Sequence, residues 1–406
     1  MTVMSTSQTT FAERSSDIAD LQLQLNAVKT YIAELTLNTS YQSVTQVPDS
    51  VVRASIQDGV QWLMNAQEKN GHFTYEFLPY EDAYKPGDNI VRQAGALFIL
   101  SEVARRSSAE NKKTADTIEN AIAYFEGLSP LHTYDGDTVA CVQKTAETQT
   151  CMLGATALAL TGILGYVEAN PSKAAGYKQT IEAYKTFILK SRKEEGGFRD
   201  EYRLGTGFRE KESPFSNGEA LLALVRYQHF NGYSEVQTTV DTSFTYLKSL
   251  PYDTSLYLWM MAALKDMQVL SPKDEYVQYA KAFTQWRMNL LVSSRSTLRN
   301  YCASTEGLVS AYSLLEDHST SVELQSLRHE INYWNQKNLL LQVSASNPYR
   351  LITEGGKFVL AKNQNIEQSA GGFLTADEEP TQRIDFTQHC VSSYLQTLVD
   401  IDGIEL

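Results

Sequence analysis

From residue 50 onward the chain alternates between two kinds of helical segment, and this alternation restricts the possible folds more than any other feature. The first kind carries polar residues along one face, as in 173–190, whereas the second is apolar nearly all round, as in 220–225. A helix that is apolar on every side is buried on every side, so the second kind must form a layer that the first kind covers. The sequence predicts outer helices at 50–67, 114–127, 173–192, 235–249, 273–293 and 321–343, and inner helices at 90–106, 147–167, 217–230, 254–268, 305–317 and 386–401.

Six such pairs predict an all-α fold, an (α/α)6 toroid of six helical hairpins over 50–406, with a tail and an extra N-terminal helix in 1–49. Repeats that share an inner layer can form one domain, even in a chain of this length. The connections into the inner helices are mostly long and those leading out are mostly short, which is typical of a rim that carries function. The inner helices therefore open on a central well, where their free N–H groups favour anionic groups.

The extra helix, expected over 11–37, has a regular apolar stripe. It places Ile18, Leu21, Leu25, Val28, Ile32 and Leu35 at alternating steps of three and four. The stripe lasts about two and a half heptads, which is shorter than the three to four that indicate a coiled coil. We expect the helix to pack on the main body, with a homodimer contact as the alternative.

A short internal repeat supports the hairpin interpretation. Three long loops begin with a glycine–aromatic element, at 71–73, 196–198 and 371–373. Each is followed by a polar cluster that opens an inner helix, at 88–93, 216–219 and 383–389. Repeats of this kind mark stacked supersecondary units.

With these elements the chain resembles the six-hairpin toroid superfamily over roughly 50–402. This group includes glucuronyl epimerases, sugar 2-epimerases, unsaturated-uronide hydrolases and polysaccharide lyases, alongside terpene cyclases and protein prenyltransferases. The element at 371–373 and the helix start at 383–389 are similar to the last hairpin of glucuronyl epimerases and of prenyltransferase β subunits. The resemblance implies an active site in the central well. It does not choose a reaction, because one fold hosts many chemistries.

Arg383, Asp385 and His389 form the first candidate group. Asp385 and His389 are four residues apart, so they can touch on one helical face, where a carboxylate orients an imidazole and raises its basicity. Such a pair suits general acid–base catalysis near neutral pH. The structural alternative is that Asp385 caps the helix and His389 is hydrogen-bonded in the core.

A second group, formed by Asp88, Asn89, Arg92 and Gln93, opens the first inner helix. Asp88 or Asn89 is suited to cap it. Arg92 and Gln93 precede a wholly apolar stretch, so we expect their side chains to point into the well and contact substrate. Arginine can hold a carboxylate through two hydrogen bonds.

The loop 72–84 is rich in aromatic residues, including Tyr75 and Tyr80. Aromatic rings offer flat surfaces to sugars, and the resemblance implies that a tyrosine serves as an acid or base. We therefore expect Tyr75 or Tyr80 to take part. The alternative is a compact loop that packs its own side chains.

Glu219 and Glu306 lie one turn into inner helices, each beside a glycine. Carboxylates inside a well can bind sugar hydroxyls or act as bases, with pKa values raised by burial. Each glutamate can equally be half of a capping box.

Charge and cysteine content bear on partners and location. A net charge of -13 argues against a nucleic-acid partner and a polybasic membrane contact. The polar start of the chain lacks the features of a secretory signal, and four cysteines are too few for a disulfide scaffold, so a reduced, cytoplasmic protein is expected. We expect no cofactor. Cys302, His389 and Cys390 could supply three ligands to zinc, although no known ligand spacing supports this.

These observations lead to one hypothesis and two alternatives. The hypothesis is a carbohydrate-active enzyme that epimerises, cleaves by elimination or hydrolyses an acidic sugar or uronate, either a small molecule or an oligosaccharide. Arg92 would hold the carboxylate, while His389, oriented by Asp385, and a loop tyrosine would exchange protons on opposite faces of the sugar. The alternatives are a terpenoid or peptide cyclase, and a non-catalytic toroid that binds a partner.

Overall fold

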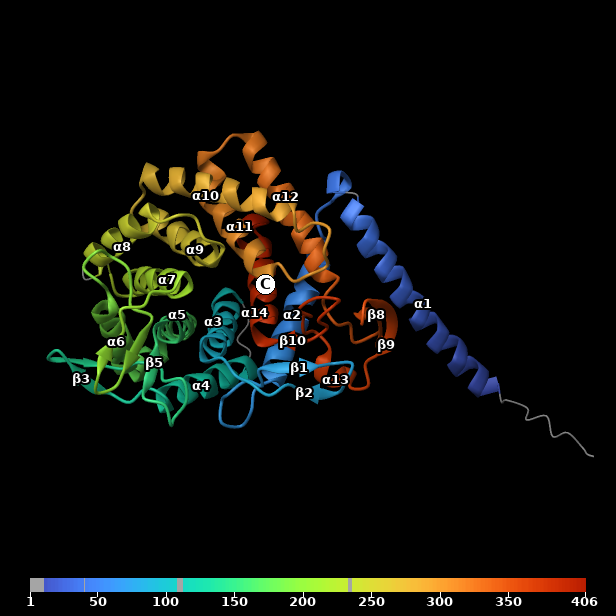
Figure 1. Cartoon of the computed structure of the whole chain (residues 1–406), viewed down its shortest axis with the longest axis horizontal. Helices are drawn as coiled ribbons and strands as arrows, with labels where there is room; N and C mark the ends of the chain where they lie inside the picture. The colour runs from blue at the N-terminus through green and yellow to red at the C-terminus, as the bar shows by residue number, and fades with distance from the viewer. Residues whose placement is uncertain (1–10, 40, 108–111, 233–235) are drawn as a thin grey trace, which may run out of the picture.

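A computed structural model describes residues 11–39, 41–107, 112–232 and 236–406, and its helices form two concentric rings (Figure 1). The inner ring consists of α3 (Ile90–Arg106), α5 (Leu153–Ala169), α7 (Pro214–Asn231), α9 (Thr254–Leu270), α11 (Cys302–Leu315) and α14 (Ile384–Gln396). The outer ring consists of α2 (Asp49–Asn65), α4 (Lys112–Gly127), α6 (Ala174–Ser191), α8 (Gln237–Ser249), α10 (Asp274–Val292) and α12 (Ser321–Leu339). Each inner helix contacts the next, and α14 contacts α3, which closes the ring. The predicted (α/α)6 toroid is confirmed.

Burial separates the two layers as the sequence predicts. Helix α5 buries every residue from Leu153 to Val167. Helix α4 buries a single stripe, formed by Thr114, Thr117, Ile118, Ala121, Ile122 and Phe125. The spacing of three and four in that stripe is the signature of a helix with one covered face.

The long loops carry short antiparallel sheets that the helical pattern did not predict. The rim has a three-stranded sheet of β10 (Gln382–Arg383), β1 (Glu76–Leu78) and β2 (Ala83–Tyr84), and another of β5 (Thr150–Met152), β6 (Glu201–Arg203) and β7 (Gly207–Phe208). Two hairpins add β3 (His132–Tyr134) with β4 (Asp137–Val139), and β8 (Tyr349–Glu354) with β9 (Lys357–Lys362). Strand β5 replaces the first turn expected for the helix at 147–167. The pairing of Glu76 with Arg383 joins the first loop of the ring to the last.

The glycine–aromatic repeat locks each of its three loops to an inner helix. The aromatic residues Phe73, Phe198 and Phe373 are buried. Their backbone N–H groups donate to the side chains of Gln93 (2.8 Å), Asn217 (2.7 Å) and Thr387 (3.1 Å). Each acceptor is the fourth residue of its inner helix, so the three hairpins share one register.

The glycines of the repeat lie against the next outer helix. Gly71, Gly196 and Gly371 have φ values of 90°, 116° and 91°, a region that side chains rarely adopt. A Cβ at Gly371 would lie 2.2 Å from the carbonyl oxygen of Asp58 in α2. The repeat therefore links neighbouring hairpins, and its third copy joins the last hairpin to the first.

The N-terminal helix α1 (Phe11–Thr39) lies outside the ring, beside β8 and β9 (Figure 1). Asp20 accepts a hydrogen bond of 2.7 Å from the Tyr349 hydroxyl, and Ala27 is buried. The helix therefore packs on the main body as predicted, but through a face other than its apolar stripe, which is exposed. The predicted tail at 1–10 lies outside the described residues.

All four cysteines are paired, which corrects the expectation of reduced thiols. Cys141 bonds to Cys151 with Cα atoms 5.6 Å apart, and Cys302 bonds to Cys390 with Cα atoms 4.7 Å apart. The second disulfide joins α11 to α14 and leaves no thiolate for the zinc considered at Cys302, His389 and Cys390. Disulfides are typical of oxidising compartments, which argues against the expected cytoplasmic location. None of the described helices is both long and apolar enough to span a membrane.

Candidate active site

A cavity of about 420 Å³ opens where the inner helices begin. Its wall draws on the N-terminal end of every inner helix and includes Arg92, Met152, Phe215, Ser216, Glu219, Trp259, Ala303, Asp385, Phe386 and His389. This is the central well that the loop pattern predicts, and its volume is typical of small-molecule sites. A larger groove of about 610 Å³ lies between α2, α3, α4 and α5, but among the residues that the structure describes Tyr166 is the one titratable side chain in its lining.

His389 in the well is held by Glu306, which lies beneath it. The imidazole Nδ1 lies 2.8 Å from Glu306 Oε2, and Glu306 is buried. The carboxylate fixes the proton on Nδ1 and leaves Nε2 as the basic nitrogen. The prediction that Asp385 orients His389 is therefore wrong, because a glutamate from the neighbouring helix α11 takes that place.

Glu306 is in turn held by a line of hydrogen bonds that runs down α14. Ser392 donates to Glu306 Oε1 (2.6 Å), Gln396 Nε2 donates to Ser392 (3.1 Å), and Ser310 donates to Gln396 Oε1 (2.9 Å). Since Ser392 already accepts from Gln396, its hydroxyl proton points to Glu306. The line fixes both oxygens of Glu306 and hence the orientation of His389.

Asp385 instead joins two arginines at the rim of the well. Its carboxylate receives two hydrogen bonds from Arg383 (3.0 and 2.7 Å) and pairs with Arg92 Nε at 2.9 Å. The Tyr75 hydroxyl bonds to Arg92, and both guanidinium groups lie over the Tyr75 ring. Two arginines against one carboxylate leave this cluster with a net charge of about +1.

Glu219 is a buried carboxyl group in the wall of the well. Among the described residues, its Oε2 has no hydrogen-bond partner. Burial, together with the nearby charge of Asp200, raises the pKa of Glu219 to about 8. Glu219 therefore carries a proton at neutral pH, whereas an ordinary glutamate does not.

Glu219 and His389 occupy equivalent positions in opposite hairpins. Each lies two residues after the locking side chain of its helix, Asn217 in α7 and Thr387 in α14. The ring runs α3, α5, α7, α9, α11 and α14, so α7 and α14 stand opposite one another. A protonated carboxyl group and an imidazole thus lie at the same helical level on two sides of one cavity.

The remaining predicted residues divide between the well and the scaffold. Asn89 lines the well and caps α3, since its side chain accepts from the N–H groups of Val91 and Arg92. Gln93 is fully buried and bonds to Phe73 and to Asp88, so both residues hold the loop. Tyr80 packs beside Leu341, Val343 and Leu374, away from the well.

Several residues of the well were not predicted. Trp259 lies with its ring 6.0 Å from the His389 ring, and Phe215 is an exposed aromatic side chain at the mouth. The buried Gln388 has an Oε1 atom that lacks a hydrogen-bond partner among the described residues. The repeat gives a signal for Asp200, because it follows Phe198 by two residues, as Tyr75 follows Phe73.

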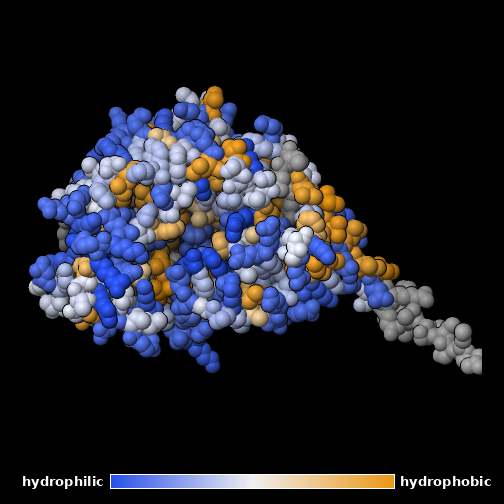
Figure 2. Space-filling model, in the orientation of Figure 1, coloured by the Kyte–Doolittle hydropathy of each residue, from blue (hydrophilic) through white to orange (hydrophobic). Residues whose placement is uncertain are grey.

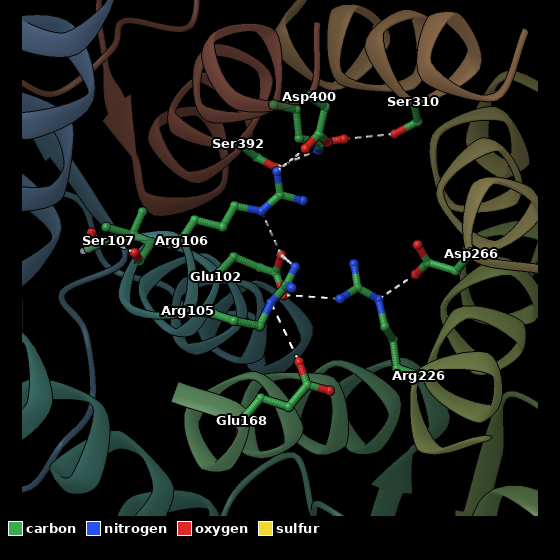
Figure 3. Close-up of polar contacts among 12 residues, drawn as sticks. Glu102, Arg105, Arg106, Ser107, Glu168, Arg226, Asp266, Ser310, Ser392 and Asp400 are labelled. Carbon is green, nitrogen blue, oxygen red and sulfur yellow. Dashed lines mark hydrogen bonds and ion pairs between the residues drawn. The ribbon is translucent and has the colours of Figure 1, made fainter. Parts of the chain in front are cut away.

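The opposite end of the ring axis is filled by ion pairs (Figure 3). Glu102 of α3 pairs with Arg105 (2.7 Å), Arg106 (3.5 Å) and Arg226 of α7 (3.4 Å). Arg226 also pairs with Asp266, and Asp400 pairs with Arg106 and with Lys265. This buried network forms a floor beneath the well.

Comparison with known proteins identifies relatives in fold. The sequence matches no protein-family model and no curated protein. Solved structures similar to it include a GH76 α-mannanase from Bacteroides thetaiotaomicron, with a TM-score of 0.60 and 10% identity over 87% of this chain and 96% of that one. Cellobiose 2-epimerase from Spirochaeta thermophila has a TM-score of 0.60 and 14% identity over 87% of this chain and 96% of that one. An unsaturated glucuronyl hydrolase specific for heparin has a TM-score of 0.56 and 11% identity over 88% of this chain and 100% of that one. At these identities the similarity establishes the fold. The chain therefore shares the (α/α)6 toroid of these enzymes, as the resemblance predicted.

Proposed function

We propose that this chain is a carbohydrate-active enzyme that acts on an acidic sugar by paired proton transfer in the central well. The observation that carries the proposal is the placement of His389 and Glu219 on opposite hairpins at the same level of one cavity. Support for a sugar substrate comes from the aromatic side chains around that cavity and from the fold neighbours named for sugar substrates.

His389 and Glu219 suit opposite halves of acid–base catalysis. With its Nδ1 proton held by Glu306, His389 accepts a proton at Nε2. Glu219 is protonated at neutral pH and donates. Epimerisation, elimination and hydrolysis each need one group that takes a proton and one that gives it.

The charge of the rim favours a substrate with a carboxylate. Arg92 lines the well, and the arginines of its cluster outnumber Asp385. The N-termini of the inner helices add positive potential there. A uronate carboxylate bound to Arg92 would lose negative charge, and this makes the adjacent C–H more acidic.

Within this cluster the Tyr75 hydroxyl accepts a hydrogen bond from the Arg92 guanidinium. Burial raises the pKa of this hydroxyl, so the phenol keeps its proton at neutral pH. Tyr75 would orient Arg92 or donate to the substrate, and the base would be His389.

The proposal is tested by incubating the protein in D2O with a panel of uronides and neutral sugars and following the products by proton NMR. We expect turnover of a uronide. Epimerisation would place deuterium at the inverted carbon, elimination would give a new vinylic proton signal, and hydrolysis would give neither. His389→Ala should lower kcat by about 10²–10⁴-fold. The matched control is His318→Ala, an exposed histidine between α11 and α12.

Each other outcome has a definite meaning. Turnover of neutral sugars alone, unchanged in Arg92→Ala, would overturn the acidic substrate. Turnover that survives in both His389→Ala and Glu219→Gln would overturn the assignment of the acid and base. Absence of turnover across the panel would contradict the enzyme proposal for these sugar classes.

A further inference from the structure

The apolar stripe on α1 faces solvent along most of the helix. Ile18, Leu21, Leu25, Val28 and Ile32 each expose between 37% and 67% of their surface. A different face of the helix holds it to the body, where Asp20 contacts Tyr349 and the Leu23 carbonyl accepts from Asn347. The helix is therefore anchored on one side while its more apolar side remains in water.

The exposed surface continues from α1 onto the neighbouring hairpin. Phe358, Val359 and Leu360 of β9 are exposed, and the Phe358 ring lies 4.9 Å from the Tyr31 ring of α1. Figure 2 shows hydrophobic residues gathered on the flank where α1 lies. Together these side chains expose several hundred Å² of apolar surface, an area that on soluble proteins marks an interaction site.

We propose that this surface, the α1 stripe with β9, is a homodimer interface and that its occupant is the same surface of a second copy. Residues 18, 25 and 32 take the a positions of a heptad and residues 21 and 28 the d positions, a pattern that is complementary to itself because the knobs of one helix fill the holes of the other. Two copies would bury on the order of 1,000 Å² in total, near the lower limit for specific interfaces.

Charge favours a second copy over a membrane surface. The sequence of α1 has four acidic and two basic residues, whereas helices that lie on membranes are rich in lysine and arginine. Gln22, Gln24 and Lys29 flank the middle of the stripe. Two copies, each with a net charge of -13, can therefore pack along this stripe without placing like charges against each other at its edges.

The test is the mass of the full chain by sedimentation velocity at about 5–100 µM. We expect a species of twice 45.5 kDa that dissociates in Leu25→Glu. Ala33→Glu is the matched control, since it adds the same charge at an exposed position of the same helix beside the stripe, and it should remain dimeric. Thermal unfolding of each variant establishes that the ring is intact.

Cysteine cross-linking tests the same interface independently, because the native cysteines are all paired. If the helices run parallel, residue 25 faces residue 25 of the other copy, so Leu25→Cys alone should cross-link two chains. If they run antiparallel, residue 25 faces residue 28 of the other copy, so the double variant Leu25→Cys with Val28→Cys should cross-link them. A monomeric wild-type mass at 100 µM, or a dimer that survives Leu25→Glu, would overturn the proposal.

Discussion

Glu219 and Glu102 are both buried carboxyl groups on inner helices, yet their surroundings shift their pKa values in opposite directions. Burial raises the pKa of Glu219 to about 8, and the charge of Asp200 acts in the same direction. Burial also opposes ionisation of Glu102, but Arg226, Arg105 and Arg106 outweigh it and hold the pKa below its usual value. One residue type therefore supplies a proton donor to the well and a permanent charge to the floor.

The raised pKa of Glu219 predicts the sign of a stability change with pH. Between about pH 4.5 and pH 8 the Glu219 carboxyl is protonated in the folded chain but ionised in the unfolded chain. The free energy of unfolding should therefore fall as pH rises from about 4.5 to about 8. Glu219→Gln should remove that part of the decline. Urea unfolding at pH 5, 7 and 8.5 measures it, with the exposed Glu195→Gln as control. An unchanged difference between wild type and Glu219→Gln across these pH values would contradict the assignment.

The same group sets a limit on activity. If protonated Glu219 is the acid, kcat/KM should decline above about pH 8, because the free enzyme loses the donor there. Glu219→Gln should abolish the basic limb along with most of the activity. A basic limb that persists unchanged in that variant would assign it to another group.

The sequence predicted five of the residues that line the well, Asn89, Arg92, Glu219, Asp385 and His389, but it paired Asp385 and His389 wrongly. The spacing of Asp385 and His389 fits a contact within one helix, yet Arg92 and Arg383 compete for the same carboxylate and are better partners for it. The true partner, Glu306, lies 83 residues away in sequence. Contacts between helices depend on the rotation of each about its axis, which the periodicity of one helix does not fix.

At the scale of elements, apolar content distinguished inner from outer helices because the two layers differ in how many faces are covered. Helix α5 illustrates this, since its one charged residue, Glu168, lies at its C-terminal end. The strands of the two three-stranded rim sheets escaped prediction because each has only two or three residues. Such short strands form through pairing across loops, as between β1 and β10, and leave no periodic pattern.

The glycine of the repeat allows a stability prediction at this scale. Gly371→Ala combines a φ of 91° with a Cβ placed 2.2 Å from the Asp58 carbonyl oxygen, so it should lower the free energy of unfolding by at least ~2 kcal/mol. Gly176→Ala in α6 meets no atom within 4 Å and should be neutral or stabilising by up to ~1 kcal/mol. Urea unfolding of the two variants compares them directly. Equal changes in the free energy of unfolding for the two variants would show that the close approach of Gly371 to α2 does not affect stability.

The disulfides provide a second prediction for the elements they join. Thiol titration of the denatured chain without reductant should find no free thiol, and four after reduction. The Cys302–Cys390 bond closes 88 residues and the Cys141–Cys151 bond closes 10. Replacing Cys302 and Cys390 by serine should therefore lower the free energy of unfolding by on the order of 4 kcal/mol, and replacing Cys141 and Cys151 should lower it by about 2–3 kcal/mol. Four titratable thiols in the oxidised protein would contradict both bonds.

At the scale of the whole molecule, the ring is closed at three levels by segments far apart in sequence. Arg383 pairs with Glu76 in the rim sheet, Gly371 lies against α2, and the ion pairs of the floor join α3, α7, α9 and the segment after α14. No hairpin can therefore leave the ring without breaking contacts at both of its neighbours. The described ring should unfold as one unit even though it is built from repeats, in contrast to open solenoids.

Glu102→Gln tests this cooperativity through the floor. The substitution leaves Arg105, Arg106 and Arg226 short of a buried counter-charge, which should cost about 3–5 kcal/mol. Glu168→Gln, at the more exposed edge of the network and 3.7 Å from Arg105, should cost much less. Because the ring is closed, the unfolding transitions followed by far-UV circular dichroism and by the fluorescence of a variant that keeps Trp259 of the well as its one tryptophan should shift together. A shift in circular dichroism while the fluorescence transition stays in place would mean that the two ends of the ring unfold separately.

Folding lowers the pKa of Glu102, so the contribution of Glu102 to the free energy of unfolding is complete above about pH 4.5 and is lost as pH falls. The difference in the free energy of unfolding between Glu102→Gln and wild type should therefore shrink in acid.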